Sequence, residues 1–320
     1  MEKEQMRRTK QSSRKFHWAS VAKFTTATVF LAAGFTVSTV AQQQGQKTFS
    51  SAEEASQALV TAAQNNDEKA MLEILGPDGK EIVSSGDDAE DAQNRGNFAK
   101  RYEEMHRLAI EPDGTTTLYI GAENWPTPIP LVHKGNAWYF DTAAGKQEIL
   151  YRRIGENELS TIRVCQELVA AEKEYRGAQH DTYTQKIVST DGQHDGLYWK
   201  ADDGQPKSPI GPLVAGAFVS DGGNAQPMPF RGYYFRFLAR QGKSGDSSKT
   251  NGFAFVAYPA EYGSSGVMSF LVREDGVVYQ KDLGKDTEPT VKSLKGNGSH
   301  SGWKKAEDVS QDETADQKTN

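Results

Sequence analysis

Acidic residues gather in one short stretch of the second half of the chain. Asp191, Asp195, Asp202 and Asp203 follow one another within a Gly-rich segment. Carboxylate oxygens in flexible loops are the ligands that calcium prefers. Their spacing differs from that of an EF-hand loop, and ordinary solvent-exposed carboxylates are the alternative interpretation. Calcium is the one cofactor that this pattern suggests, and we predict no other.

The histidines do not extend this pattern into a zinc site. Two His-Asp pairs, His180-Asp181 and His194-Asp195, recur along the same stretch. A zinc site needs three or four ligands that converge on one point. The sequence has neither an HExxH motif nor paired cysteines. We interpret both pairs as ordinary residues of loops and helix ends.

Two positions in the sequence could supply a nucleophile, and both have a structural interpretation that explains them better. The run from Gly263 to Gly266 (GSSG) resembles a nucleophile loop, but GxSxG is absent and no partner base can be assigned. A tight turn between two strands explains the run better. Cys165 lies in the apolar stripe of a helix, which favours a buried and inert thiol. We assign no catalytic residue and leave open whether the chain is an enzyme.

Aromatic residues are concentrated in the second half, where strand alternation would expose some of them. Exposed aromatic residues mark contact surfaces for proteins, peptides or glycans. The alternative is that they fill the core of a small sheet. If a contact site exists, we expect it at a strand-end loop and at a second aromatic pair. Its residues would be Tyr258, Pro259, Tyr262, Gly263, Tyr198 and Trp199.

The first half offers residues that could line a ligand pocket. Tyr102, His106, Trp125 and Trp138 are the candidates. We place His106 on a helix, one turn after Tyr102, where charged neighbours favour a solvated face. No catalytic His-Asp pair can be named from this set.

The N-terminal segment has the three parts of a secretory signal peptide. Positions 1–41 carry seven basic and two acidic residues, and an apolar run of 18 residues fills 24–41. Thr39 and Ala41 are the small residues that precede a cleavage site before Gln42. We predict an exported protein, periplasmic or secreted. An uncleaved inner-membrane anchor formed by 24–41 is the alternative, because that run is at the lower limit for spanning a bilayer.

Charge excludes several classes of partner. The 320 residues contain 37 Lys and Arg and 43 Asp and Glu, a net charge of −6 at pH 7. Removing positions 1–41 makes the charge of the remaining chain −11. Such an acidic chain is repelled by nucleic acid and anionic lipid. We therefore predict no nucleic-acid partner and no stable membrane span after processing. A single cysteine excludes an intrachain disulfide.

The chain after the signal divides into a linker, two α+β modules and a tail. The linker is Gln-rich, the modules each combine helical and strand patterns, and the tail is polar and mostly disordered. The boundaries are 42–48 for the linker, 49–156 for the N-terminal module, 157–284 for the C-terminal module and 285–320 for the tail.

The N-terminal module changes from helical to strand periodicity along its length. Apolar spacing predicts helices within 50–76 and 95–111, with a polar loop at 84–92. Alternating runs follow, joined by a hairpin turn at Lys134-Gly135-Asn136. This order resembles the NTF2-like fold, in which helices cover a curved sheet.

The C-terminal module begins with a long helix, predicted from Glu158 to Tyr175, whose buried stripe includes Cys165 and Glu172. A meander of antiparallel strands follows, with a hairpin turn at Glu274-Asp275-Gly276. The order resembles the soluble heads of type IV pilins and pseudopilins, which pack one long helix on a small sheet. The helix begins in polar sequence, so the resemblance implies the head architecture without a filament role.

Five sequence blocks carry a more specific resemblance. They are GLYW (196–199), SPIGPLVA (208–215), GYYFRFL (232–238), GFAFVAYPAEYGSSGVMSFLV (252–272) and GVVYQKDLG (276–284). In order and spacing, they resemble the bacterial family known as domain of unknown function 2950, over about residues 120–303. The resemblance implies an exported protein of Gram-negative bacteria whose activity is unassigned.

Two functions remain open at this stage. The first is a non-catalytic interaction or assembly module with a protein partner in the cell envelope. It follows from the predicted export, the acidic charge and the missing catalytic constellation. The second is a small-ligand-binding protein or an envelope enzyme that uses a pocket in the N-terminal module. It follows from fold analogy alone.

Overall fold

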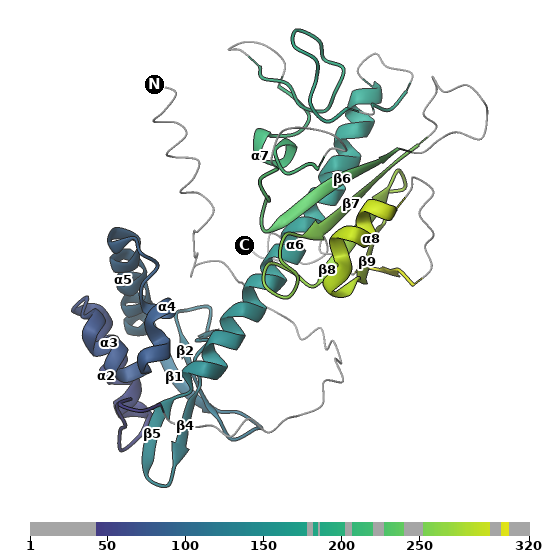
Figure 1. The fold of residues 1–320 in the computed structure, drawn as a ribbon. Coiled ribbons are helices and arrows are strands. Elements are labelled where there is room, and N and C mark those ends of the chain that lie inside the picture. Colours follow the sequence, from purple (N-terminus) through teal and green to yellow (C-terminus); the bar gives the residue numbers. More distant parts are fainter. Residues whose placement is uncertain are drawn as a thin grey trace, which may run out of the picture. The chain divides into compact units, whose positions relative to one another are not determined.

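The computed structural model describes residues 43–177, 182–184, 186–201, 207–219, 227–239, 252–294 and 302–306 (Figure 1). The chain forms two compact units, which divide between Tyr151 and Arg152. The predicted signal peptide, His180, Asp181, Asp202 and Asp203 lie outside the described residues.

Unit 1 begins with a layer of helices. These are α2 (Ala52–Gln64), α3 (Glu68–Leu75), a 3₁₀ turn at Pro77–Gly79, α4 (Lys80–Val83) and α5 (Asp88–Glu104). Ser51 caps the start of α2, because its Oγ accepts from the Glu54 amide at 3.1 Å. The Glu54 carboxylate in turn accepts from the amide of Ser50, the residue before the cap, at 2.9 Å.

The position of α5 differs from our prediction. Helix was expected over 95–111 after a polar loop at 84–92, whereas α5 begins at Asp88. The Asp87 side chain caps the helix by accepting from the amides of Ala89 and Glu90, both at 3.1 Å. Carboxylates in the first turn complement the helix dipole, so an acidic run begins a helix here. The helix ends at Glu104, and His106 lies on a strand.

The second layer of unit 1 is an antiparallel sheet. Its strands are β1 (His106–Ile110), β2 (Thr116–Ile120), β3 (Trp125–Pro126), β4 (Leu131–Lys134) and β5 (Ala137–Phe140). The order is β1-β2-β4-β5, and β3 pairs with β2. The predicted hairpin joins β4 to β5, with Val132 opposite Tyr139.

Apolar side chains from the helices and the sheet meet in one core in unit 1. The largest contributors are Phe49, Leu59, Ile74, Leu75, Phe98, Tyr102, Leu118, Ile120, Leu131 and Phe140.

The helix α6 (Thr142–Gly177) crosses the division between the units. Our prediction placed its start at Glu158, because the polar stretch 155–158 was interpreted as the beginning of the helix. The structure continues helix through this stretch. Its C-terminal half enters the core of unit 2 with Cys165 and Leu168, both 0% exposed.

Unit 2 packs α6 against a second antiparallel sheet. The strands are β6 (Tyr233–Ala239), β7 (Phe253–Pro259), β8 (Met268–Arg273), β9 (Val278–Asp282) and β10 (Lys304–Lys305), in the order β10-β9-β8-β7-β6. The short helix α7 (Pro212–Ala215) precedes them.

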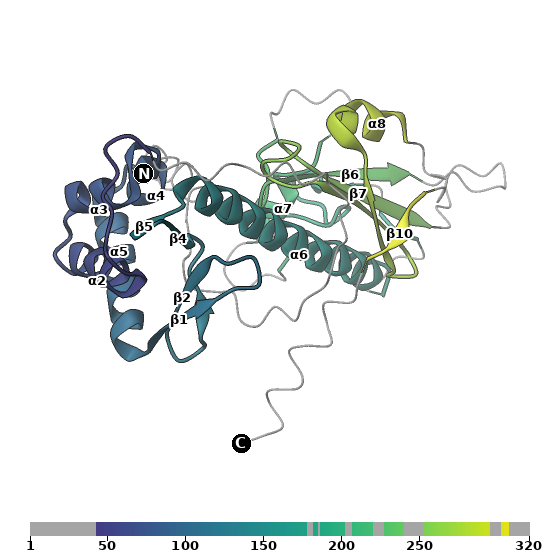
Figure 2. The same ribbon diagram turned by 90° about the horizontal axis from the view of Figure 1, so that it is seen from below.

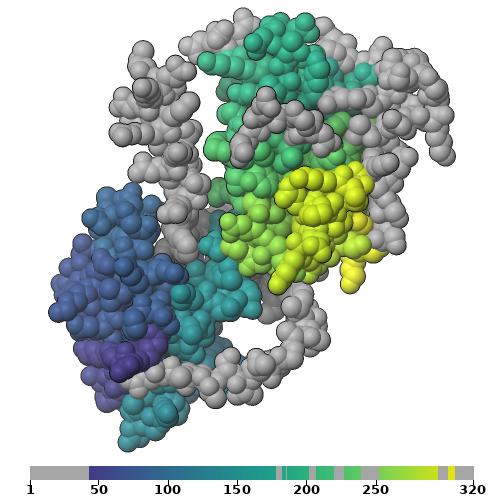
Figure 3. Space-filling model, viewed as in Figure 1, coloured from purple at the N-terminus to yellow at the C-terminus, as the bar shows by residue number. Residues whose placement is uncertain are grey.

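A further helix, α8 (Thr287–Ser293), lies in the region that we predicted to be a tail. It covers the face of the sheet opposite α6 (Figure 2). In the space-filling view this yellow segment lies on the surface against the green strands (Figure 3). The architecture of helices and antiparallel sheets confirms the predicted α+β class.

Every residue of β7 is buried, because both faces of the sheet are covered. Phe253, Phe255 and Ala257 enter the cluster that contains residues of α6. Val256 and Tyr258 enter the cluster that contains Val291 of α8. A strand buried on both faces has a continuous apolar run and not an alternating one.

Candidate functional site

The structure corrects our placement of Tyr258 and Pro259. We predicted that both lie in a strand-end loop, but they are the last residues of β7 and both are buried. Tyr258 is 3% exposed and belongs to the core beneath α8. Burial raises the pKa of its hydroxyl to about 12. These two residues therefore do not form an exposed contact surface.

Tyr262 and Gly263 do lie in the turn that follows β7. The Tyr262 hydroxyl donates to Asp282 Oδ2 at 3.2 Å. Gly263 has φ +75°, and its amide donates to the Gly266 carbonyl at 2.8 Å. The Ser265 hydroxyl accepts from the Glu261 amide at 3.0 Å. The turn thus closes on itself, in agreement with its interpretation as tight-turn chemistry.

Side chains of α6 hydrogen-bond to this turn. Asn157 Nδ2 donates to the Ser265 carbonyl at 2.8 Å. One oxygen of Glu158 accepts from the amides of Val267 and Met268, both at 2.9 Å. Burial raises the pKa of the Glu158 carboxyl, and the two amide bonds oppose that rise. The GSSG segment is therefore fixed as a structural junction between α6 and the start of β8.

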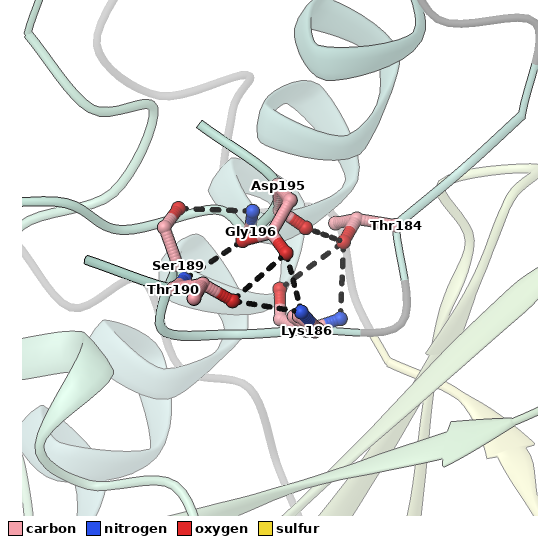
Figure 4. A network of polar contacts seen from close by, with 6 residues as sticks. All are labelled: Thr184, Lys186, Ser189, Thr190, Asp195 and Gly196. Atoms are coloured by element: carbon pink, nitrogen blue, oxygen red, sulfur yellow. Dashed lines mark hydrogen bonds and ion pairs between the residues drawn. The ribbon is translucent and has the colours of Figure 1, made fainter. Parts of the chain in front are cut away.

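The best organised exposed segment of unit 2 follows α6. Its centre is Asp195, whose carboxylate pairs with Lys186 Nζ. The same carboxylate accepts from the Thr190 amide at 2.8 Å and from the Thr190 hydroxyl at 3.0 Å (Figure 4). The hydrogen bond from Lys186, followed by that from the Thr190 amide, lowers the pKa of Asp195 to about 2. Asp195 therefore stays ionised and holds the loop closed.

Backbone contacts complete this network from two sides (Figure 4). The Thr184 hydroxyl donates to the Asp195 carbonyl at 2.8 Å. The Gly196 amide donates to Ser189 Oγ at 2.9 Å. A Cβ atom on Gly196 would lie 2.8 Å from the backbone nitrogen of Ser189, so only glycine fits there.

The same loop carries apolar and aromatic side chains. Val188 is 57% exposed, and its backbone bridges to Tyr198. The exposed imidazole of His194 stacks on Trp199, with ring centroids 4.3 Å apart and planes at 16°. Tyr198 and Trp199 are half-buried. We call Val188, His194, Tyr198 and Trp199 the loop face.

The network changes the interpretation of the predicted calcium ligands. Asp195 is already paired with a cation, Lys186. Asp191 is exposed. Within the described segments, no group of three or more His, Cys, Asp or Glu side chains could hold a metal ion. Because Asp202 and Asp203 lie outside those segments, the calcium site stays a prediction.

A buried carboxyl group lies directly beneath the loop. Glu172 of α6 is 0% exposed, and its Oε2 accepts from the Thr184 amide at 3.2 Å. Its Oε1 has no hydrogen-bond partner. Burial raises the pKa of Glu172 to about 8 against the opposing effect of the Thr184 bond. Glu172 lies in the predicted buried stripe, and an acidic residue at such a position is the signal in the sequence that could have indicated a role.

The four predicted pocket residues of unit 1 do not line one cavity. Tyr102 is buried in the core and stacks on His106, with centroids 3.9 Å apart. His106 Nδ1 lies 2.9 Å from the Tyr102 carbonyl oxygen. Trp138 packs beside the core and bridges to Phe49 at the far edge of the sheet. Three of the four thus serve local packing.

Trp125 lines a hollow on the surface of unit 1. The hollow has a volume of about 300 Å³ and lies between α5 and the ends of β2 and β3. Lys100 and Arg101 contribute positive charge to its wall, whereas Glu104 and Glu123 contribute negative charge. The remaining lining residues are Asn97, Phe98 and Ile120.

Cys165 has no access to solvent. Its side chain is 0% exposed in the core between α6 and the sheet of unit 2. Burial raises the pKa of its thiol to about 12. The thiolate is the nucleophilic form, so this cysteine is a packing residue, as its position in the helix stripe predicted.

The chain is thus an α+β protein of two units, and the helix α6 contains the point at which they divide. A family model described as protein of unknown function (DUF2950) matches residues 46–306, and the chain belongs to this family. This confirms the family resemblance of the five sequence blocks. No curated protein and no solved structure matches the chain. Among the described residues, no helix is both long and apolar enough to cross a membrane.

Proposed function

We propose that the chain is an exported protein of the bacterial cell envelope that acts by binding a protein partner, without catalysis. The basic and apolar pattern of positions 1–41 supports export. The contact surface in this proposal is the loop face of unit 2, formed by Val188, His194, Tyr198 and Trp199.

One observation carries the proposal: the loop face presents the exposed Val188 and the stacked rings of His194 and Trp199 on a backbone that is fixed by a polar network. Loops on a rigid scaffold are common sites of recognition. Here the Asp195–Lys186 pair and the Thr184 and Ser189 bonds fix the loop before any partner arrives. Preorganisation of this kind lowers the entropic cost of binding.

Several side chains that could do chemistry are used in internal contacts, which supports binding over catalysis. Ser265 and Glu158 hold the turn after β7. Cys165 is buried, and Asp195 neutralises Lys186. His106 is stacked on Tyr102. Each of these groups therefore already has a structural contact within the chain.

Cross-linking in intact cells tests the contact surface. A photoreactive residue at Val188 should give an adduct with an envelope protein. The matched control is the same residue at Leu213, which is 53% exposed in the same unit. No adduct at Val188, or the same adduct from both positions, would contradict the proposal.

The location is tested separately by fractionation and N-terminal sequencing. The periplasmic or secreted form should begin at Gln42. If the exported fraction lacks the protein, or if the isolated protein begins at Met1, the export proposal fails. Recovery in the inner membrane with residues 24–41 intact would favour the anchored alternative.

Binding of a small ligand in unit 1 is the second candidate function. The hollow of about 300 Å³ beside Trp125 favours it, because pockets of this size accept small molecules. A ligand bound there should quench Trp125 fluorescence and raise the melting temperature. Trp125→Phe should remove the quenching while the melting temperature of the free protein changes little. A ligand that stabilises both forms equally binds elsewhere.

A further inference from the structure

The strand β1 is an uncovered edge of the sheet in unit 1. The sheet order begins with β1, whose only strand partner among the described residues is β2. The opposite edge, at β5, is covered because Phe49 bridges to Trp138 with two backbone bonds of 2.8 Å. Among the described residues, no segment covers β1 in this way. An unpaired edge is a template for another strand.

The direction of the free backbone groups follows from the pairing with β2. Glu111 donates its amide to Thr115, and Gly121 donates its amide to Met105. In an antiparallel pair, bonded residues alternate along the strand. Odd-numbered residues of β1 therefore bond to β2, whereas the amides and carbonyls of Leu108 and Ile110 point away from the sheet.

The side chains of β1 do little to discourage pairing. Ile110 is 80% exposed, the largest exposure among the large apolar residues of the described chain. Natural edge strands are protected by lysine, proline, bulges or an inward-pointing charge. The run from His106 to Ile110 has no lysine and no proline, and its register with β2 contains no bulge.

We propose that two copies of this chain pair through β1, antiparallel, about a two-fold axis at Ala109. Leu108 then exchanges both backbone bonds with the partner's Ile110, and the same exchange occurs on the other side of the axis. The four bonds use the amides and carbonyls that point outward. The pairing also places each exposed Ile110 beside an apolar residue, the partner's Leu108.

Charge complementarity selects this register. Centring on Ala109 places Arg107 opposite the partner's Glu111, twice. Opposite charges directly across a strand pair are stabilising. Centring on Leu108 would place Arg107 opposite alanine, and centring on Arg107 would place like charges together.

The side chains of Arg107 and Glu111 are already held on the same face of the sheet. Arg107 Nε donates to Asn124 Oδ1 at 2.7 Å, and its guanidinium lies 3.9 Å from the centre of the Tyr119 ring. The Tyr119 hydroxyl donates to Glu111 Oε1 at 3.1 Å. Tyr119 thus holds both groups on one face of the sheet, where the second copy would meet them. Fixing long side chains in advance reduces the entropy lost on pairing.

The length of β1 limits the strength of this dimer. Five residues from each copy form a small interface, and small interfaces belong to transient complexes. The dimer should therefore be reversible and dependent on concentration. The proposal is independent of the loop face, which lies in unit 2.

Disulfide trapping tests both the dimer and its register. Facing residues at a non-hydrogen-bonded antiparallel position have Cα atoms about 4.5 Å apart, which a disulfide can span. Ala109→Cys in the full chain should therefore form a covalent dimer under mild oxidation. The only native cysteine, Cys165, is buried, so background cross-linking is low.

Thr117→Cys is the matched control, because Thr117 lies opposite Ala109 on β2, one strand away from the axis. It should remain monomeric under the same oxidation. Equal trapping at both positions would show random collision and would overturn the proposal. Trapping by Leu108→Cys but not by Ala109→Cys would overturn the register.

Sedimentation of the full chain tests the reversible dimer without oxidation. Ile110→Pro removes an outward amide without touching a bond to β2, and it should abolish association. Ile110→Thr, which keeps the amide, should retain it. Arg107→Glu should weaken association by about tenfold, since two attractive pairs become repulsive, and the double variant R107E/E111R should restore it.

Circular dichroism identifies any variant that fails to fold. If Ile110→Pro does not fold, the charge-swap pair alone decides the test. A wild-type chain that stays monomeric at its highest soluble concentration would overturn the proposal. A dimer that persists unchanged in Ile110→Pro and Arg107→Glu would also overturn it, because another surface would then be responsible.

Discussion

The ring of Tyr233 occupies the space that a side chain at Gly266 would need. A Cβ atom at Gly266 would lie 2.7 Å from Cε2 of that ring and closer still to its hydroxyl oxygen. Tyr233 is 0% exposed, and its hydroxyl donates to the Met268 carbonyl at 2.8 Å. The ring therefore cannot withdraw without breaking this hydrogen bond. Tyr233, which lies on the distant strand β6, therefore requires a glycine at position 266.

Gly266→Ala should destabilise the protein. The added methyl group overpacks a closed interior, which costs about 1–3 kcal/mol. Gly155→Ala is the matched control, because no atom lies within 4 Å of a Cβ there and the residue is inside α6. The control should be stabilised by about 0.5–1 kcal/mol. Urea unfolding measures both, and an unchanged midpoint for Gly266→Ala would contradict the packing described.

Because of Glu172, the free energy of unfolding should fall as the pH rises from about 4.5 to about 8. Its pKa is raised from 4.5 to about 8 in the folded chain, so the folded state binds the extra proton between these values. The stabilisation is complete below the unfolded pKa and is lost as pH rises through the folded one. The slope is at most about 1.4 kcal/mol per pH unit.

Glu172→Gln should remove this slope and should be more stable than wild type at alkaline pH. Unfolding free energies measured between about pH 5 and pH 9 give the difference between the two proteins. Glu167→Gln, which replaces an exposed glutamate on the same helix, should run parallel to wild type. If the unfolding free energies of wild type and Glu172→Gln changed with pH in parallel, the pKa of Glu172 would not be raised by folding.

Asp195→Ala should loosen the loop that follows α6. The Thr190 amide loses its acceptor, so its hydrogen exchange should accelerate several-fold. Asp191→Ala, an exposed aspartate in the same loop, is the control and should leave Thr190 protected. In wild type the protection should persist at neutral pH. It should be lost as pH falls towards about 2, because the pKa of Asp195 is lowered to that value.

Cys165 should be inert in the native protein. A thiol reagent needs the thiolate, and burial both blocks access and raises the pKa of Cys165 to about 12. Labelling should be at least about a hundredfold slower than in the urea-unfolded chain, since it must wait for opening. Fast labelling of the native chain would mean that the core between α6 and the sheet is accessible.

Local patterns predicted the elements well where neighbours in sequence decide the structure. The Lys134-Gly135-Asn136 turn gave the β4–β5 hairpin, because turn residues act within a few positions. The run 252–272 predicted both β7 and the family. The start of α5 was missed because an acidic run was interpreted as a solvated loop, whereas it supplies the cap and the first helical turn.

Contacts between distant segments could not be predicted from pattern alone. Tyr258 was expected in an exposed loop because nothing near it in sequence shows that α8 covers that face. The role of Glu172 depends on Thr184, which meets it only after the chain has turned back. The hollow beside Trp125 is likewise assembled from α5 and two strand ends.

The continuity of α6 has a consequence for how the chain folds. Its first turn is held in unit 1, where the Thr142 hydroxyl donates to the Leu75 carbonyl. Its later turns are held in unit 2, where Leu168 is buried. Starting a helix is the costly step, and extending one costs little. Whichever unit folds first therefore provides the nucleus from which the other unit's helix grows, and a cut at Tyr151 would deprive both of it.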